Sequence, residues 1–348
     1  MKLLILTQKV DKNDSILGFF HDWLRVFATH CEKLTIICLY KGEYDLPKNV
    51  KVLSLGKEEE DSFTNRFKYI YRFYRYILQE RCNYSNVFVH MNSEYVVLGG
   101  IFWKLMRKNI ALWWTHKATP WHLRIAEKFT DIIFTASRES FRLPTKKIKI
   151  VGHGIDINKY SFVDRRSGIG DRRLITVGRV SESKDLKTMI KAVEILEDVK
   201  LDIIGGPLDE KDENYFEELK QMVKDKKLDC KVNFVGPIPN KDIIKYYHDA
   251  DLFIHASQTG SLDKVVLEAM ACGLPIISCN DAVKNDLLRK YPDLIYSKGD
   301  YQALARRIEK VLNTGKEKRA ELGKELRDIV KNNHSLEKLI KKICKSYL

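Results

Sequence analysis

The stretch GSLDKVVLEAMACGLPIIS, residues 260–278, decides the fold of this chain. Its first part carries apolar residues at helical spacing and leads through a glycine- and proline-containing turn into the short apolar run LPIIS. Such a run is typical of a strand that is buried on both faces, as in a parallel sheet covered by helices. Glu268 lies inside the helix, a few residues before the strand.

Four further runs of the same kind precede this stretch, each followed by a segment with helical spacing. They are RLITVGR (173–179), VKLDIIGG (199–206), KVNFVG (231–236) and DLFIHAS (251–257). The first half repeats the pattern with KLLILTQ, KLTIICLY, KVLSLG, NVFVHMN, IALWWTH, DIIFTAS and KIKIVGHG. We therefore expect an α/β fold made of two Rossmann-like, doubly wound domains.

Length and local composition predict where these domains divide. The chain has 348 residues, which is more than one hydrophobic core usually serves. The polar, glycine-containing segment 162–173 is typical of a hinge. We expect an N-terminal domain at 1–160, joined by a helix at about 330–348, and a C-terminal domain at 161–330. Open α/β sheets bind ligands at the carboxyl ends of their strands, so the predicted site is a central cleft between the domains.

Composition also limits the compartment and the partners. The seven cysteines contain no C-x-x-C spacing, the first residues lack the apolar region of a signal peptide, and no run of about 20 apolar residues occurs. These features predict a cytoplasmic location. The 61 Lys and Arg against 47 Asp and Glu give a formal net charge of +14, which indicates anionic partners. A nicotinamide-dependent oxidoreductase is disfavoured because no G-x-G-x-x-G follows the first strand.

Two cations follow the first strand of the second half. Gly178 permits a tight turn, and Arg179 and Lys184 then lie at the carboxyl end of the strand and the start of a helix. Two such charges can bind a diphosphate, although both side chains could instead be hydrated surface charges. Pro237 and Ile238 follow a later strand and are placed to offer backbone groups to a nucleobase.

The opening stretch contains a candidate anion site of its own. A serine- and glycine-containing loop at 257–261 precedes a helix that begins near Asp263. The unpaired N–H groups and the positive dipole end of such a helix attract anions. Glu268 has two acceptor oxygens, which suit the two hydroxyls of a ribose. The alternative for Glu268 is an acid that only complements the helix dipole.

Four segments taken together resemble a known family, the retaining GT-B glycosyltransferases of family 4. These enzymes move a sugar from a nucleotide donor to an acceptor. The segments are VGRVSESKDLKTMIKA, LDIIGG, VNFVGPIPNKDIIKYYHDADLFIHAS and VVLEAMACGLPIIS, and the resemblance is strongest over 174–290. The last segment is close to the family signature EAMA.G.PV. The resemblance implies the GT-B fold, with a C-terminal helix that returns to the N-terminal domain.

The resemblance also implies roles for individual residues. Arg179 and Lys184 would hold the donor diphosphate during catalysis, and Glu268 would bind the ribose. The loop implied to bind the phosphates and the sugar contains Ser261, Leu262, Asp263, Lys264 and Val265.

The first half resembles the family more loosely. Gly18 stands where the family keeps a glycine near the donor phosphates. His116 resembles a catalytic histidine near the transferred sugar, and its alternative is a histidine packed beside Trp113 and Trp114.

The sequence departs from the family pattern in the sugar-facing loop. Gly260 stands where the family carries a second glutamate, and Ser261 and Asp263 replace glycines. We expect activity to be retained with altered sugar contacts. The alternative is a catalytically idle GT-B protein that binds a nucleotide or a partner.

On this resemblance we expect a UDP- or GDP-linked sugar as donor and a saccharide or lipid-linked acceptor, in cell-surface polysaccharide or glycolipid synthesis. No cofactor or metal is expected, because two cations and helix-end amides can stabilise the leaving diphosphate. The cluster HDADLFIH (248–255) spans a helix end and a strand, so its side chains are expected to diverge and to hold no metal.

The segment FTNRFKYIYRFYRYILQER, residues 63–81, interleaves aromatic and basic side chains. A helix of this kind could lie on an anionic membrane at the inner face of the cell membrane. The alternative is a core-packing helix with a hydrated basic face. A nucleic-acid partner is not expected, because it leaves the ordered set of Arg179, Lys184 and Glu268 unexplained.

Overall fold

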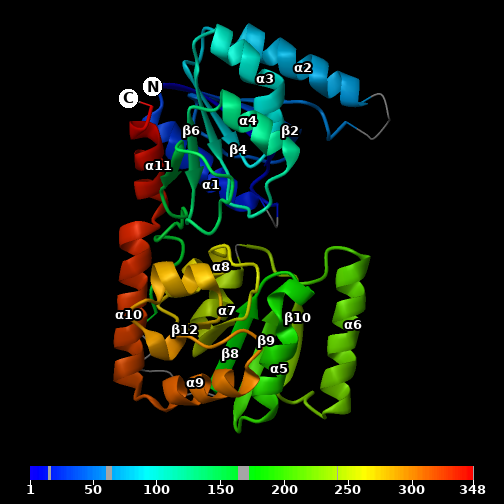
Figure 1. Ribbon diagram of the computed structural model, residues 1–348, viewed down its shortest axis with the longest axis vertical. Helices are drawn as coiled ribbons and strands as arrows, with labels where there is room; N and C mark the ends of the chain where they lie inside the picture. Colours follow the sequence, from blue (N-terminus) through cyan, green and yellow to red (C-terminus); the bar gives the residue numbers. More distant parts are fainter. Residues whose placement is uncertain (15–16, 60–64, 164–171, 241, 348) are drawn as a thin grey trace. The chain divides into compact units, whose positions relative to one another are not determined.

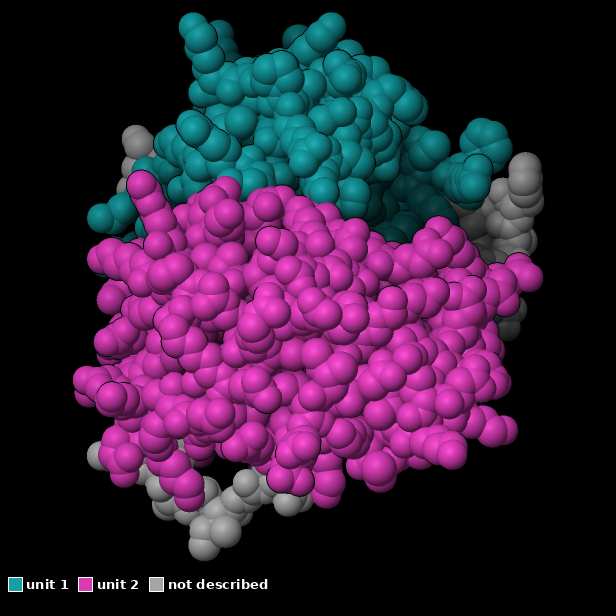
Figure 2. Space-filling model, turned by 60° about the horizontal axis from the view of Figure 1, so that its bottom comes forward, with its two compact units in different colours: residues 1–154, 336–348 teal, residues 155–335 magenta. Residues whose placement is uncertain are grey.

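The computed structural model describes residues 1–14, 17–59, 65–163, 172–240 and 242–347. The described chain forms two compact units, residues 1–154 with 336–348 and residues 155–335 (Figure 2). Eight residues of the predicted hinge, 164–171, lie outside the described part.

Unit 1 contains a parallel sheet in the order β3-β2-β1-β4-β5-β6-β7 (Figure 1). Its strands are β1 (Lys2–Val10), β2 (Lys33–Lys41), β3 (Val50–Ser54), β4 (Asn86–His90), β5 (Asn109–Trp113), β6 (Ile132–Thr135) and β7 (Ile148–Ile150). Its helices are α1 (Gly18–His30), α2 (Asn65–Gln79), α3 (Ser93–Leu105), α4 (Trp121–Phe129) and α11 (Leu336–Lys345).

The alternation of side chains along β1 divides the core of unit 1 into two layers. Leu3 and Ile5 pack with α1 and α11 on one face of the sheet, and Leu4 and Leu6 pack with α2, α3 and α4 on the other. Helix α11 contacts α1, so the C-terminal helix returns to the N-terminal unit.

Unit 2 contains a second parallel sheet in the order β10-β9-β8-β11-β12. Its strands are β8 (Arg172–Val177), β9 (Val199–Ile204), β10 (Val232–Gly236), β11 (Leu252–His255) and β12 (Ile276–Ser278). Its helices are α5 (Leu186–Glu194), α6 (Glu210–Asp225), α7 (Ile243–Asp249), α8 (Lys264–Ala271), α9 (Tyr301–Asn313) and α10 (Lys316–Asn333). Short helical turns lie at Glu182–Lys184, Val283–Leu287 and Pro292–Leu294.

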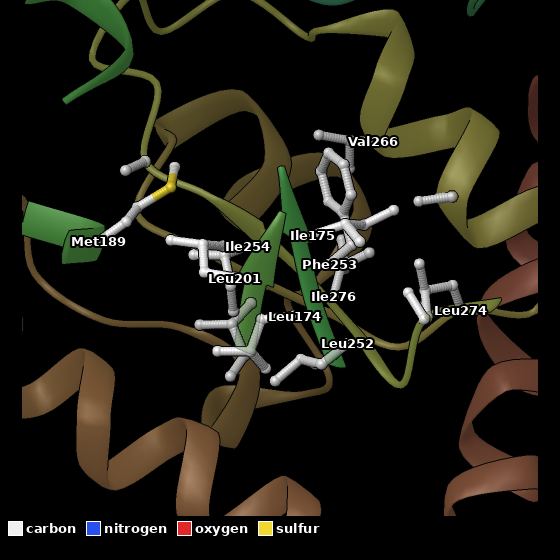
Figure 3. Packing of buried hydrophobic residues seen from close by; sticks show 14 of the residues in the cluster. Leu174, Ile175, Met189, Leu201, Leu252, Phe253, Ile254, Val266, Leu274 and Ile276 are labelled. Carbon is white, nitrogen blue, oxygen red and sulfur yellow. The ribbon is translucent and has the colours of Figure 1, made fainter. Parts of the chain in front are cut away.

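The central strands of unit 2 are apolar on both faces, as the sequence predicted. Leu174, Ile175, Leu252 and Phe253 are all buried in one continuous core (Figure 3). Helix α5 packs against α9, and α8 packs against α10. Two parallel sheets covered by helices confirm the predicted α/β class. Within the described residues, we find no helix with both the length and the apolar character needed to cross a bilayer.

Candidate active site

The residues predicted to act on a donor follow the carboxyl ends of the strands in unit 2. All five strands are parallel, so the segments after them emerge at one edge of the sheet. The chain runs from β8 to β9 and β10 in one direction and then crosses to β11 on the other side of β8. The position between β8 and β11 is therefore a topological switch point, where open α/β sheets bind ligands.

Glycines stand at the ends of β8, β9 and β10, and one of them lets the loops after β8 and β9 pack backbone against backbone. Gly178, Gly205 and Gly236 have φ values of 149°, 132° and 85°, which are strained for residues with a side chain. A Cβ atom on Gly205 would lie 1.9 Å from the carbonyl oxygen of Gly178. The tight turn predicted at Gly178 therefore depends on a second glycine in the neighbouring loop.

Arg179 is oriented by a buried carboxylate on α6. Its Nε lies 3.3 Å from Oδ2 of Asp212, which also accepts a hydrogen bond from the backbone N–H of Leu208. Neither terminal nitrogen of the guanidinium hydrogen-bonds to another part of the described chain. This part of the side chain can therefore present paired N–H donors to a phosphate.

Lys184 ends the short turn after β8 and is not a hydrated surface charge. Its Nζ lies 2.5 Å from Oδ2 of Asp263 and 3.4 Å from Oγ of Ser257. The side chains of Lys184 and Asp263 are only 22% and 18% exposed. An ammonium group has three N–H donors, so one donor of Lys184 is left for a phosphate oxygen.

Asp263 joins Lys184 to a buried histidine at the end of β11. The same Oδ2 lies 2.9 Å from Nε2 of His255, whose Nδ1 lies 2.9 Å from Oγ of Ser278. Because a carboxylate only accepts, Nε2 carries the proton and Nδ1 accepts from the Ser278 hydroxyl. Lys184, Asp263, His255 and Ser278 thus form one network across the switch point between β8 and β11.

The network fixes the charge of its members. Burial raises the pKa of Asp263, but His255 and Lys184 outweigh this effect and hold it well below its ordinary value. Burial lowers the pKa of His255 more than Asp263 raises it, so the imidazole is neutral at pH 7. The network therefore contains one positive and one negative charge.

Glu268 lies in the buried face of α8 and is held by three side chains. Tyr247 donates to Oε2 at 3.1 Å, and Nζ of Lys264, one helical turn earlier, lies 3.0 Å from Oε1. Burial raises the pKa of Glu268, but Lys264 and the hydrogen bonds from Tyr160 and Tyr247 lower it below its ordinary value. An acid that only complements the helix dipole would not need these side-chain partners, so they argue against that alternative for Glu268. The predicted ribose hydroxyls would have to share these oxygens with the residues that hold them.

The remaining predicted residues of unit 2 lie along the same edge. Pro237 is exposed and Ile238 half-buried directly after β10. In the loop before α8, Leu262 is buried and belongs to the core, whereas Ser261 is half-buried. Val265, the second residue of α8, is also half-buried.

The two predicted residues of unit 1 occupy different positions. Gly18 is the first residue of α1, and its N–H donates to the carbonyl of Asp14 at 3.0 Å. His116 is exposed after β5, and its Nδ1 accepts from the N–H of Ala118 at 3.0 Å. The alternative of a histidine packed beside Trp113 and Trp114 is therefore wrong, because the side chain of His116 is exposed. The backbone carbonyl of His116 accepts a hydrogen bond from Nε1 of Trp114.

The sequence interpretation missed several residues of this site. Asp212 and Tyr247 orient Arg179 and Glu268, and neither was selected from the sequence. His255 was considered only within the cluster at 248–255, whose side chains do diverge: Nε2 of His248 bonds to the carbonyl of Ser161, whereas His255 faces Asp263. The one available signal was a histidine at the carboxyl end of a strand.

The sheet orders and the site at the switch point define a doubly wound protein of the GT-B class, and comparison with known proteins agrees. The structure is similar to Anabaena HepE in complex with UDP and glucose (TM-score 0.77, 18% identity, 99% of each chain covered). It is also similar to sucrose-phosphate synthase from Thermosynechococcus elongatus (TM-score 0.79, 16% identity, 100% of this chain and 98% of the other covered). The GT-B fold implied by the sequence is confirmed.

The family assignment rests on unit 2. Residues 162–329 match the family described as "Glycosyl transferases group 1", which confirms the resemblance of this segment to glycosyltransferases. The amylovoran biosynthesis glycosyltransferase AmsK of Erwinia amylovora is 30% identical over 174 residues, which are 47% of this chain and 41% of the relative. Mannosylfructose-phosphate synthase of Agrobacterium fabrum is 26% identical over 153 residues, which are 40% of this chain and 34% of the relative. The chain thus spans about two fifths or less of these curated relatives.

Proposed function

We propose that this chain is a glycosyltransferase that moves a hexosyl unit from a nucleotide sugar to a saccharide or lipid-linked acceptor. The observation that carries the proposal is the meeting of Lys184 with the start of α8 at the switch point of a group 1 domain. Arg179 lies on the same connection after β8, and Glu268 is buried in α8.

The proposed reaction retains the configuration of the sugar and needs no metal. The acceptor hydroxyl attacks the anomeric carbon on the face from which the diphosphate leaves, and a phosphate oxygen takes the hydroxyl proton. The bond from the anomeric carbon to the diphosphate breaks, and the negative charge that develops is stabilised by Arg179, Lys184 and the N–H groups at the start of α8.

Three similar proteins support the choice of substrates. HepE was solved with UDP and glucose, which favours a uridine diphosphate donor over the guanosine alternative. AmsK acts in amylovoran biosynthesis, and a Streptococcus pneumoniae relative, 28% identical over 138 residues, is an alpha-monoglucosyldiacylglycerol synthase. These names support polysaccharide or glycolipid synthesis. The proposed location is the cytoplasm or the inner face of the cell membrane. Contact of residues 65–81 with an anionic membrane would bring the protein to a lipid-linked acceptor. Residues 63 and 64 of the predicted segment lie outside the described residues.

The test begins with binding and then measures transfer. We expect UDP or GDP to raise the melting temperature, because a ligand that binds only the native state stabilises it. Radiolabelled UDP- and GDP-sugars, incubated with lipid extract or oligosaccharide in EDTA, should give a labelled product whose anomeric configuration matches the donor by NMR. If a nucleotide binds but neither transfer nor donor hydrolysis occurs, the idle protein suggested by Gly260 is the correct alternative. If no nucleotide binds, the transferase and the idle nucleotide-binding protein are both wrong, and only an idle protein that binds a partner is left.

A further inference from the structure

Helix α2 has two apolar faces, one that points into the core of unit 1 and one that points outward. Phe73 and Ile77 point into the core of unit 1, as expected for a helix that covers a sheet. A second apolar stripe faces outward, at spacings of three and four residues that place its members on one side of a helix. This outward stripe consists of Phe67, Ile70, Tyr71, Tyr74 and Leu78.

The exposure of this stripe is large for side chains of this kind. Phe67 is 78% exposed and Tyr71 is 66% exposed. Scattered apolar residues are normal on protein surfaces, but a contiguous apolar patch marks a surface that binds something.

Helix α3 extends the patch. The ring of Tyr74 lies 5.1 Å from that of Phe102, and its hydroxyl donates to the carbonyl of Leu98 at 3.1 Å, so the two helices meet at this point (Figure 1). Beyond Phe102, Ile101 is 56% exposed and Leu105 is 77% exposed. We call the outward apolar residues of both helices the α2/α3 surface: Phe67, Ile70, Tyr71, Tyr74, Leu78, Ile101, Phe102 and Leu105. All of them are exposed except Tyr74, which is half-buried.

The charges beside this surface are positive. Helix α2 contains no acidic residue, and Lys68 and Arg72 share the single carboxylate of Glu59. Arg66 and Arg75 are exposed and form no ion pair with any residue that the structure describes. Aromatic and aliphatic side chains flanked by unneutralised arginines are complementary to an interface of acyl chains and anionic headgroups.

We propose that the α2/α3 surface docks on anionic lipid bilayers, with Phe67, Tyr71 and Leu105 entering the headgroup region and Arg66 and Arg75 contacting lipid phosphates. The inference adds α3 to the segment that the sequence suggested and does not depend on the glycosyl transfer proposed above. Charge complementarity favours a membrane over a second copy of this chain, whose equal arginines would repel one another.

The test is flotation of the whole chain with vesicles of phosphatidylcholine containing 30% phosphatidylglycerol. We expect the parent protein to float with these vesicles and to bind pure phosphatidylcholine much more weakly. Phe67→Ser with Tyr71→Ser should weaken binding about tenfold or more. Arg66→Gln with Arg75→Gln should weaken it about 25-fold at low salt, since each charge near an anionic surface contributes about fivefold.

Two controls make the result decisive. Arg289→Gln with Arg306→Gln removes the same charge from exposed positions of unit 2 and should leave binding unchanged. All variants replace exposed side chains, so their far-ultraviolet circular dichroism and melting temperatures should match the parent. The proposal is overturned if the control pair weakens binding as much as the α2 arginine pair, or if the serine variant binds like the parent. It is also overturned if sedimentation without lipid shows an oligomer that Phe67→Ser and Tyr71→Ser dissociate, because the surface would then join copies of the chain.

Discussion

The pair formed by Lys184 and Asp263 should be a strong and measurable interaction. Their charged atoms are 2.5 Å apart, which corresponds to about 7 kcal/mol of attraction at an effective dielectric constant of 20. Desolvation of both groups offsets much of this energy. We expect Asp263→Asn, which keeps an acceptor for His255, to lower the free energy of unfolding of unit 2 by about 3 kcal/mol at pH 7. Lys184→Met should have a similar effect, because it leaves the carboxylate without its cation.

A double-mutant cycle separates the pair from its surroundings. If the two residues stabilise the fold through each other, the double variant should lose about 2 kcal/mol less than the sum of the single variants. All five tryptophans lie in unit 1, so their fluorescence reports on unit 1, whereas circular dichroism reports on both units. Urea unfolding followed by both signals assigns the change to unit 2. Single-variant effects that add to within about 0.5 kcal/mol would refute the coupling.

The pH dependence gives an independent check of the same pair. The folded pKa of Asp263 lies below its ordinary value of about 3.9, so its stabilisation is complete above about pH 4 and is lost as the pH falls towards the folded pKa. The difference in unfolding free energy between the parent and Asp263→Asn should therefore be constant from pH 7 to pH 5 and narrow below pH 4. A difference that grows on acidification would show that the carboxylate is not stabilised in its charged form.

Three further predictions concern the rest of the site. Arg179→Met should abolish the increase in melting temperature given by UDP or GDP. The control Arg173→Met changes an exposed arginine at the opposite end of β8 and should preserve this increase. Equal increases in both variants would show that Arg179 is not part of the phosphate site. Tyr247→Phe should lower the unfolding free energy by about 1–2 kcal/mol, because Glu268 loses a buried donor, and urea unfolding at pH 7 measures this loss. The pKa of His255 should lie below its ordinary value of about 6.5, and the neutral ring should carry its proton on Nε2. Nitrogen NMR that finds a doubly protonated imidazolium at pH 7 would contradict the network.

Local sequence pattern was sufficient to predict the doubly wound class and to place the candidate site residues of unit 2 after the carboxyl ends of its strands. Both depend on features that repeat along the chain, namely apolar strands, helical spacing and glycines at strand ends. The ion pair from Lys264 to Glu268 also follows from helical spacing, since the residues are four positions apart.

The network at the switch point could not be derived in this way. Lys184 and Asp263 are 79 positions apart and meet only because β8 and β11 are neighbours in the sheet. Strand order is a property of the whole fold, and no local pattern encodes it. For the same reason, the aromatic residues of α2 indicated an amphipathic helix but not that it has an inward and an outward apolar face.

The return of α11 to unit 1 has a consequence for how the protein is made. Leu336, Leu339 and Ile340 complete the layer formed by Trp23 and Phe27, although they leave the ribosome about 300 residues later. Residues 1–154 are translated first, and part of one apolar face of their sheet therefore stays uncovered until α11 has been synthesised. A chaperone that binds nascent chains would find its target on that face, and ribosome-bound chains stalled before residue 336 should be captured more strongly than chains stalled after residue 348 has emerged.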